Sequence, residues 1–200
     1  IRMLLGAIRC ASEDENVDGL IISLDAKKAF DSVEHKYIEA CLRKLGLNSF
    51  IPIFKVLYSG LRSDIIINGR IVKGFEIKRG VKQGDALSCI LFLICIEPLI
   101  LNINANRDIK PIRSPKYNIE LPKLAGYADD VSSVMKRTQK GLDELFNEYE
   151  RLTKQSGLEL NAQKTEIMRL KKGLADDRND LYAVQYCGQR HIIKACDVTK

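Results

Sequence analysis

Residues 121–135, Leu-Pro-Lys-Leu-Ala-Gly-Tyr-Ala-Asp-Asp-Val-Ser-Ser-Val-Met, place two apolar runs around an acidic pair, Asp129 and Asp130. The runs at 121–125 and 131–135 predict the two strands of a β-hairpin with both acids at its turn. Acids at a turn stay solvated, whereas acids inside a strand would be buried at high cost. Because adjacent side chains on an extended backbone point to opposite faces, at most one acid of the pair faces a partner squarely.

A third acid, Asp25, follows the apolar run 20–24 about a hundred residues upstream. Carboxylates that converge from two strands suit Mg²⁺, a hard cation that binds oxygen ligands together with substrate phosphates. Two such ions can clamp the attacking and leaving oxygens of a phosphoryl transfer. Adjacent acids are also common at turns, and Asp176-Asp177 is expected to be only a solvated loop. The acidic pair alone therefore does not decide the function.

Four segments resemble motifs A to D of reverse transcriptases, in the order of that family. They are residues 23–31 (SLDAKKAFD), 79–85 (RGVKQGD), 126–130 (GYADD) and 157–165 (GLELNAQKT). The sequence AFD with His35 close behind it is typical of non-LTR retrotransposons (LINE-like elements) and their group II intron relatives. The resemblance is clear from about residue 19 to residue 168 and weaker beyond.

Strand patterns that alternate with helix patterns around an antiparallel hairpin predict an α+β fold. The resemblance implies a polymerase palm, an antiparallel sheet backed by helices, in one reverse transcriptase domain over residues 1–200. It places the palm at about 19–31 and 79–170, part of the fingers at about 46–78, and a palm/thumb-junction hairpin within 171–200. The chain starts inside an amphipathic pattern without Met, so we expect a palm-centred fragment. The other fingers motifs would precede residue 1, and the thumb would follow residue 200.

Hydrophobic periodicity and turn residues predict the individual elements. Helices are expected at residues 1–12, 32–45, 49–57, 85–103 and 138–156, and a polar loop at 104–121. Strands are expected at residues 20–25, 62–68, 70–78 and 164–170, followed by a charged turn at 176–180 and a hairpin at 182–193. Ser32 and Gly46 are expected to cap the helix between them, and Pro98 to kink the long apolar helix.

Composition narrows the class of protein. With 46% hydrophobic residues the chain can build one core, and its net charge of +6 and pI of about 9.0 suit a polyanionic partner. The six cysteines show no CxxC or metal-ligand spacing, so they are interpreted as buried apolar residues in a reducing compartment. No apolar run approaches the ~18 residues of a membrane span. We expect an intracellular protein of the nucleus or a cytoplasmic ribonucleoprotein, neither secreted nor bound to a membrane, of undetermined oligomeric state.

The resemblance implies RNA-directed DNA polymerase activity for retrotransposition. A primer 3′-hydroxyl would attack the α-phosphate of a dNTP on an RNA or DNA template. Asp25 and Asp129 would ligate two Mg²⁺ ions, with Mn²⁺ as a substitute, and Asp130 would contribute at the primer side. The main-chain carbonyl of Ala26 would be a further ligand. Phosphoryl transfer depends on positioning and charge neutralisation more than on covalent chemistry.

Phe30 lies five residues after Asp25. The resemblance implies that its ring packs under the incoming sugar and excludes a 2′-hydroxyl, since a ring offers that group neither room nor a hydrogen bond. A plain core phenylalanine is the alternative. Asp31 is expected to cap the helix that begins near Ser32. His35 is expected to be a structural residue on the helix surface, not a ligand.

The motif B segment precedes the N-terminus of a predicted helix. Exposed N–H groups and the positive end of the dipole favour phosphate or template contact by Gln83 and Gly84. Gly84 is expected to let the backbone approach closely. Arg79 and Lys82 either contact phosphates or form a solvated basic loop. Motif B departs from the family at Ala86, where Pro is usual, so the helix start is expected to differ slightly.

Two further residues take their roles from the resemblance. Lys164 would protonate the departing pyrophosphate as a general acid, and an exposed lysine at a strand edge is the alternative. Tyr127 would lie at the primer terminus.

Three other functions compete with a reverse transcriptase. An intron maturase or an RNA-templated RNA polymerase is a close relative, but Phe30 favours deoxynucleotides. A catalytically silent remnant that binds nucleic acid or protein would be supported by loss of an acid, yet all three acids are present. A palm-fold nucleotide cyclase would not explain motif B. An isolated fragment without fingers and thumb can be folded yet inactive.

Overall fold

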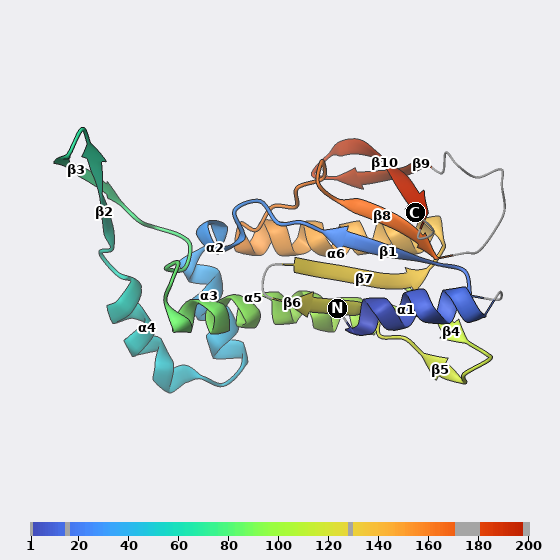
Figure 1. Cartoon of the computed structure of the whole chain (residues 1–200). Coiled ribbons are helices and arrows are strands. Elements are labelled where there is room, and N and C mark those ends of the chain that lie inside the picture. Colours follow the sequence, from blue (N-terminus) through green and yellow to red (C-terminus); the bar gives the residue numbers. More distant parts are fainter. Residues whose placement is uncertain (1, 15–16, 128–129, 171–180, 198–200) are drawn as a thin grey trace.

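A six-stranded sheet organises the molecule (Figure 1). Its spatial order is β6 (Leu124–Tyr127), β7 (Asp130–Lys136), β1 (Gly19–Leu24), β8 (Glu166–Leu170), β10 (Gln189–Asp197) and β9 (Leu181–Tyr186). Neighbouring strands are antiparallel except β8 and β10, which are parallel. The structure, a computed structural model, describes residues 2–14, 17–127, 130–170 and 181–197.

Strand β1 lies between β7 and β8 at the centre of the sheet. Its pairing runs from Gly19 opposite Lys136 to Leu24 opposite Val131 on β7. Five of its six residues are buried, as expected for a strand that is covered on both faces. Leu20, Ile22 and Leu24 join one core cluster, whereas Ile21 joins the other.

Helices cover the two faces of the sheet. The larger core lies under α5 (Ala86–Ala105) and α6 (Gln139–Ser156), and α1 (Arg2–Glu13) packs through the smaller core on the opposite face. Both ends of α6 are as predicted. The Thr138 hydroxyl accepts a hydrogen bond from the Gly141 N–H at 3.2 Å, and Gly157 ends the helix at a φ of 76°.

Helix α5 has the length and composition of a membrane span, and it is the one such helix among the described residues. This corrects the expectation that no segment qualifies, because that expectation counted uninterrupted apolar runs and not a whole helix. Core helices pass the same test, and α5 packs against α3 and α6 with seven buried side chains: Ser88, Leu91, Phe92, Cys95, Ile96, Leu99 and Ile103.

The helix predicted at 32–45 is two helices. A single turn, α2 (Ala29–Ser32), is followed by extended backbone at Val33 and then by α3 (His35–Lys44). Ser32 does not cap α3, because its hydroxyl donates to the carbonyls of Lys27 and Lys28 at 3.0 and 2.9 Å. Val33 is buried, and its carbonyl accepts a hydrogen bond from a distant segment, which favours the break.

A short helical segment and a hairpin project from the sheet beyond α3 (Figure 1). The 3₁₀ turn Asn48–Phe50 leads into α4 (Ile51–Tyr58), which has Pro in its first turn and matches the helix predicted at 49–57. Strands β2 (Arg62–Ile67) and β3 (Arg70–Glu76) are joined at Asn68 and Gly69, both with positive φ. The strands predicted at 62–68 and 70–78 are therefore confirmed, and they pair as a hairpin.

The predicted polar loop at 104–121 contains a small hairpin, β4 (Arg113–Ser114) and β5 (Ile119–Glu120). The buried carboxylate of Asp14, at the end of α1, holds this hairpin. It accepts hydrogen bonds from the Ser114 hydroxyl at 2.7 Å and the Lys116 N–H at 3.2 Å. The loop is thereby held against the end of α1.

Two details of the C-terminal part complete the fold. Strands β9 and β10 form the predicted hairpin, with Cys187 and Gly188 at its turn, and the expected turn at 176–180 lies outside the described residues. The expectation that all six cysteines are buried is wrong for three of them, because Cys89, Cys187 and Cys196 are exposed.

Candidate active site

The ends of two central strands bring the predicted acids together. Asp25 directly follows β1, and Asp130 opens β7 as an exposed residue. Because Leu24 pairs with Val131, the two acids lie at the same end of neighbouring strands. Tyr127 ends β6 and pairs in register with Asp130. Asp129, Ala128 and the side chain of Tyr127 lie outside the described part of the structure.

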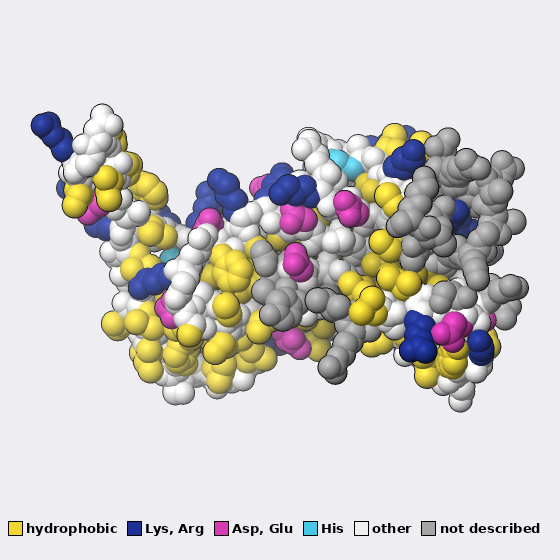
Figure 2. Space-filling view, in the orientation of Figure 1, with side chains coloured by type: hydrophobic (Ala, Val, Ile, Leu, Met, Phe, Trp, Pro, Cys, Tyr) yellow, Lys and Arg dark blue, Asp and Glu magenta, His cyan; other side chains and the backbone are white. Residues whose placement is uncertain are grey.

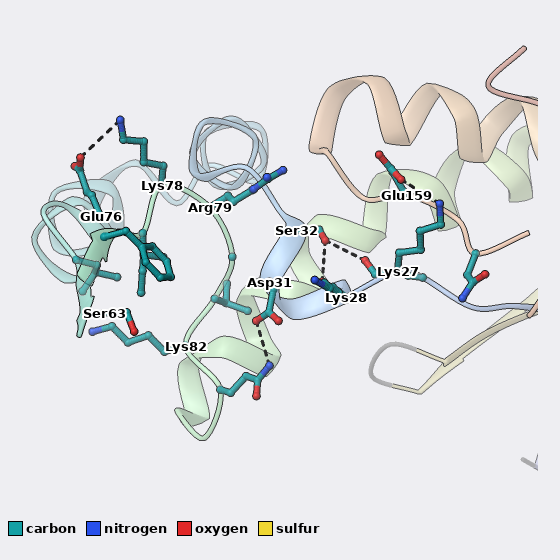
Figure 3. Close-up of a pocket in the computed structure, with 18 of the residues that line it drawn as sticks. Lys27, Lys28, Asp31, Ser32, Ser63, Glu76, Lys78, Arg79, Lys82 and Glu159 are labelled. Atoms are coloured by element: carbon teal, nitrogen blue, oxygen red, sulfur yellow. Dashed lines mark hydrogen bonds and ion pairs between the residues drawn. The ribbon is translucent and has the colours of Figure 1, made fainter. Parts of the chain in front are cut away.

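A cleft of about 1460 Å³ opens beside Asp25 (Figure 3). Its walls come from motif A, from the base of the β2–β3 hairpin, from the motif B loop and from the motif D turn. The predicted site residues that line it are Asp25, Ala26, Arg79, Lys82, Gln83 and Lys164. Three of the four motifs therefore share one cavity.

The cleft carries an excess of positive charge. Among the described lining residues, seven cations face four acids; the cations are Lys27, Lys28, Arg62, Lys78, Arg79, Lys82 and Lys164. Among the described residues, two of these cations form ion pairs. Lys27 pairs with Glu159 at 3.3 Å, and Lys78 pairs with Glu76 at 3.7 Å. Lysine and arginine side chains gather between the hairpin and the sheet (Figure 2). Such a concave basic surface attracts phosphate groups.

Main-chain hydrogen bonds fix motif A against the motif D turn. The Asn161 N–H donates to the Asp25 carbonyl at 2.7 Å, and the Lys27 N–H donates to the Glu159 carbonyl at 2.7 Å. These bonds use the backbone on either side of Ala26 and not the Ala26 carbonyl. Lys164 is exposed in the same turn, and its N–H donates to the Asn161 carbonyl at 3.0 Å.

Phe30 is half-buried on the core side of motif A. Its ring stacks on Phe92 at a centroid distance of 4.8 Å, and it is not among the described residues that line the cleft. This placement agrees with the plain core alternative. The role in sugar selection stays a prediction from the resemblance.

Asp31 is not the helix cap that the sequence predicted. It lies inside α2, and its Oδ1 accepts a hydrogen bond from the Gln83 side-chain amide at 3.1 Å (Figure 3). Its carboxylate therefore links motif A to motif B, because the break at Val33 moves the start of α3 away from it.

The motif B loop reaches α5 through a regular cap. The Asp85 carboxylate accepts from the Leu87 N–H at 3.0 Å, so the helix starts at Ala86 without the usual Pro. Gly84 has a φ of 86°, which favours glycine, and a Cβ added there would have no protein atom within 4 Å. The close approach of its backbone to a phosphate or template base stays a prediction. Arg79 and Lys82 are exposed at the cleft, with the Lys82 ammonium 5.8 Å from the Tyr58 ring centroid.

His35 is not the surface residue that the sequence predicted. It is half-buried at the start of α3, and its Nε2 lies 2.8 Å from the Gly80 carbonyl oxygen. Sequence reasoning also missed Lys27, Lys28 and Asn161, although the two lysines lie only two and three residues after Asp25. Lys28 adopts a left-handed conformation with a φ of 46°, and strained backbone of this kind is common at functional sites.

The donor set at the strand ends fits a divalent metal ion. Asp25 and Asp130 supply carboxylate oxygens from adjacent strands, and such hard oxygen donors are what Mg²⁺ prefers. Among the described residues, no three His, Cys, Asp or Glu side chains form a group that could hold a metal. The predicted site needs Asp129 as its third acid.

Buried tyrosines lie behind the site. Burial, together with the charges of Tyr186 and Asp25, raises the pKa of Tyr149 well above its usual range. Burial also raises the pKa of Tyr186 to about 12. The Tyr186 hydroxyl accepts from the Leu160 N–H at 2.7 Å, so β9 supports the turn that contacts Asp25.

Comparison with known proteins gives relatives of one kind. The family described as reverse transcriptase (RNA-dependent DNA polymerase) matches residues 6–191. A Pol polyprotein of the type-1 retrotransposable element R2 from Popillia japonica is 34% identical over 112 residues, which is 56% of this chain and 18% of the relative. The R2DM Pol polyprotein of Drosophila melanogaster is 32% identical over 145 residues, covering 72% of this chain and 13% of the relative.

A third relative and one solved structure also match this chain. A 149 kDa protein of transposon TX1 from Xenopus laevis is 31% identical over 111 residues, 55% of this chain and 8% of the relative. Telomerase from Candida tropicalis matches with a TM-score of 0.58 and 16% identity over 96% of this chain and 39% of its own, which shows the fold. The chain spans less than a fifth of each of these curated relatives.

These matches and the mixed helix-and-sheet architecture confirm the predicted α+β palm fold. The chain therefore belongs to the reverse transcriptase family, as a domain of the non-LTR retrotransposon type.

Proposed function

We propose that this chain is the catalytic domain of an RNA-directed DNA polymerase that extends a primer 3′-hydroxyl with dNTPs on an RNA or DNA template, for retrotransposition. The observation that carries the proposal is the shared cleft, in which Asp25, Gln83 and Lys164 from three separate motifs line one basic cavity. Reverse transcriptases use divalent metal ions and bind a template and a primer.

The acids at the strand ends would hold the metal ions. Asp25, Asp129 and Asp130, with the Ala26 carbonyl, form a donor set suited to Mg²⁺, with Mn²⁺ as a substitute. When bound, the ions lower the pKa of the primer hydroxyl and neutralise phosphate charge. The main-chain bonds from the motif D turn to Asp25 and Lys27 keep the first of these acids in place.

Cationic side chains in the cleft would act on the triphosphate. Lys28, Arg79 and Lys82 are exposed there and can contact its oxygens, and the positive charge draws the nucleotide in. Lys164 would donate a proton to the departing pyrophosphate oxygen. Gln83 would contact the nucleotide or the template base from the loop before α5, with Gly84 beside it. Phe30 would shape the sugar position, and Tyr127 would contact the primer end.

The domain assignment follows the same proposal. The palm takes in about residues 19–31 and 79–170, and the inserted part at about 46–78 contributes to the fingers. Strand β10 pairs with β8, which supports placing the C-terminal hairpin at the palm edge towards a thumb. The basic charge and the absence of any predicted disulfide pattern support an intracellular, ribonucleoprotein location, and the buried face of α5 supports a core helix over a membrane span.

The test is Mg²⁺- or Mn²⁺-dependent dNTP incorporation on a primed RNA template. It should compare this chain alone with the same segment exchanged into a full-length relative, so that template and primer have their other contacts. Asp25→Asn and Asp129→Asn should each reduce incorporation at least about 10²–10³-fold. Asp143→Asn, which changes a partly exposed acid on α6, is the matched control and should leave incorporation unchanged.

Two results would contradict the proposal. One is incorporation that survives both acid variants. The other is a folded protein that binds primer and template in both contexts yet never extends the primer, which would establish the silent binding module instead.

A further inference from the structure

The His35 side chain forms a hydrogen bond between α3 and the motif B loop. Its Nε2 lies 2.8 Å from the Gly80 carbonyl oxygen, and because a carbonyl only accepts, Nε2 carries the proton. Two rings pack edge-on against the imidazole, Phe54 with centroids 6.1 Å apart and Tyr58 with centroids 5.3 Å apart. The orientation of the imidazole is therefore fixed by packing as well as by its hydrogen bond.

Motif A and motif B are joined at this point by main-chain bonds. The Gly80 N–H donates to the Val33 carbonyl and the Val81 N–H to the Phe30 carbonyl, both at 2.7 Å. Gly80 has a φ of 87°, and a Cβ there would lie 2.8 Å from the Asp31 Cα. The loop thus lies so close to the motif A turn that no side chain fits between them.

The residues on either side of this junction face the cleft. Arg79 directly precedes Gly80, and Lys82 and Gln83 follow within three residues. Any movement of the Gly80 carbonyl would carry these side chains with it and change the distance between the motif B loop and Asp25.

We propose that His35 is a positioning residue for the incoming nucleotide: its hydrogen bond to Gly80 holds the motif B loop at a fixed distance from motif A. His35 contacts no described residue of the predicted metal site and is not a catalytic residue. The inference rests on the proposed polymerase function, because it requires that the ligand bound with the help of the motif B loop is a nucleotide.

The test compares His35→Ala with His35→Gln, because the glutamine amide can reach the same carbonyl. In His35→Ala the KM for dNTP should rise about five- to tenfold with kcat within about twofold, the size of one lost hydrogen bond. His35→Gln should restore most of the loss. His191→Ala, the other histidine of the chain, is the matched control and should change neither constant.

A second readout does not depend on activity. Amide hydrogen exchange at Gly80 and Val81 should become about tenfold faster in His35→Ala, while exchange within α6 stays as in the wild type. If the wild type incorporates no dNTP, either alone or exchanged into a full-length relative, but exchange at these two amides responds to His35→Ala, the polymerase proposal has failed and the structural link stands. Unchanged exchange and unchanged KM would overturn the role of His35. Faster exchange throughout α3 with an equal fall in kcat would also overturn it, because the residue would then only stabilise the fold.

Discussion

Strand β1 leads directly to Asp25 in the cleft, and the base of the β2–β3 hairpin forms one wall of the same cleft, but the two elements are built differently. Five of the six β1 residues are buried between two neighbouring strands and two core clusters. The hairpin has no buried residue, and its isoleucines are exposed, Ile66 by 72% and Ile71 by 74%. Local sequence predicted both elements equally well. The two elements differ in how deeply their residues are buried. Asp25 therefore follows the element that is expected to be the more stable.

The largest expected difference between β1 and the β2–β3 hairpin is in their contribution to the free energy of unfolding. Leu24→Ala on β1 should lower the free energy of unfolding by about 2–5 kcal/mol, because it leaves a cavity in the main core. Ile66→Ala in the hairpin should change it by less than about 0.5 kcal/mol, since that side chain is already in water. Urea unfolding followed by circular dichroism measures both. Equal losses would show that the hairpin is as firmly packed as the sheet.

The next difference is in catalysis. Lys164 stands on the turn bonded to Asp25, so Lys164→Ala should lower kcat about 10²-fold with little change in the KM for dNTP. Lys78 stands at the base of the hairpin and pairs loosely with Glu76, so Lys78→Ala should change only KM, by about twofold. Steady-state incorporation kinetics separate the two constants. A normal kcat for Lys164→Ala would identify Lys164 as merely an exposed strand-edge lysine.

A smaller effect on stability is expected at Tyr186, whose hydroxyl supports the turn that contacts Asp25. Tyr186→Phe removes the hydroxyl that bonds Leu160 and Thr153, which should cost about 1–2 kcal/mol at pH 8. Burial raises the pKa of Tyr186 to about 12, whereas a tyrosine of the unfolded chain titrates near ~10. Between these values the folded state keeps a proton that the unfolded state loses, so this stabilisation is complete below pH ~10 and is lost as pH rises towards about 12.

Tyr186→Phe should therefore lose stability less steeply than the wild type as the pH rises from ~10 to about 12. Urea unfolding at a series of pH values tests this. Parallel curves for the two proteins would show that Tyr186 does not titrate in the way its burial implies.

Sequence predicted those features that depend on neighbours along the chain. The helix ends predicted at 85, 138 and 156 agree with the structure, because the caps Asp85, Thr138 and Gly157 act within one turn. Asn68-Gly69 specified its hairpin for the same reason. Motif order then located the cleft, because Asp25, Gln83 and Lys164 do line one cavity.

The features that sequence did not predict depend on contacts between distant segments. The break at Val33 follows from a bond to Gly80, and the partner of Asp31 is Gln83, 52 residues away. The sequence predicts His35 at the helix surface because nothing local indicates that Gly80 approaches it. Likewise, the parallel pairing of β10 with β8 has no signal within either strand.

The most direct test asks whether the strand ends at Asp25 and Asp130 form a nucleotide-dependent metal site. Mn²⁺ is added together with a dNTP, and the paramagnetic broadening of the backbone amide signals is measured. We expect broadening of the amide signals around Asp25, Val131 and Asn161, and loss of this broadening in Asp25→Asn. Broadening centred elsewhere, or unchanged by that substitution, would contradict it.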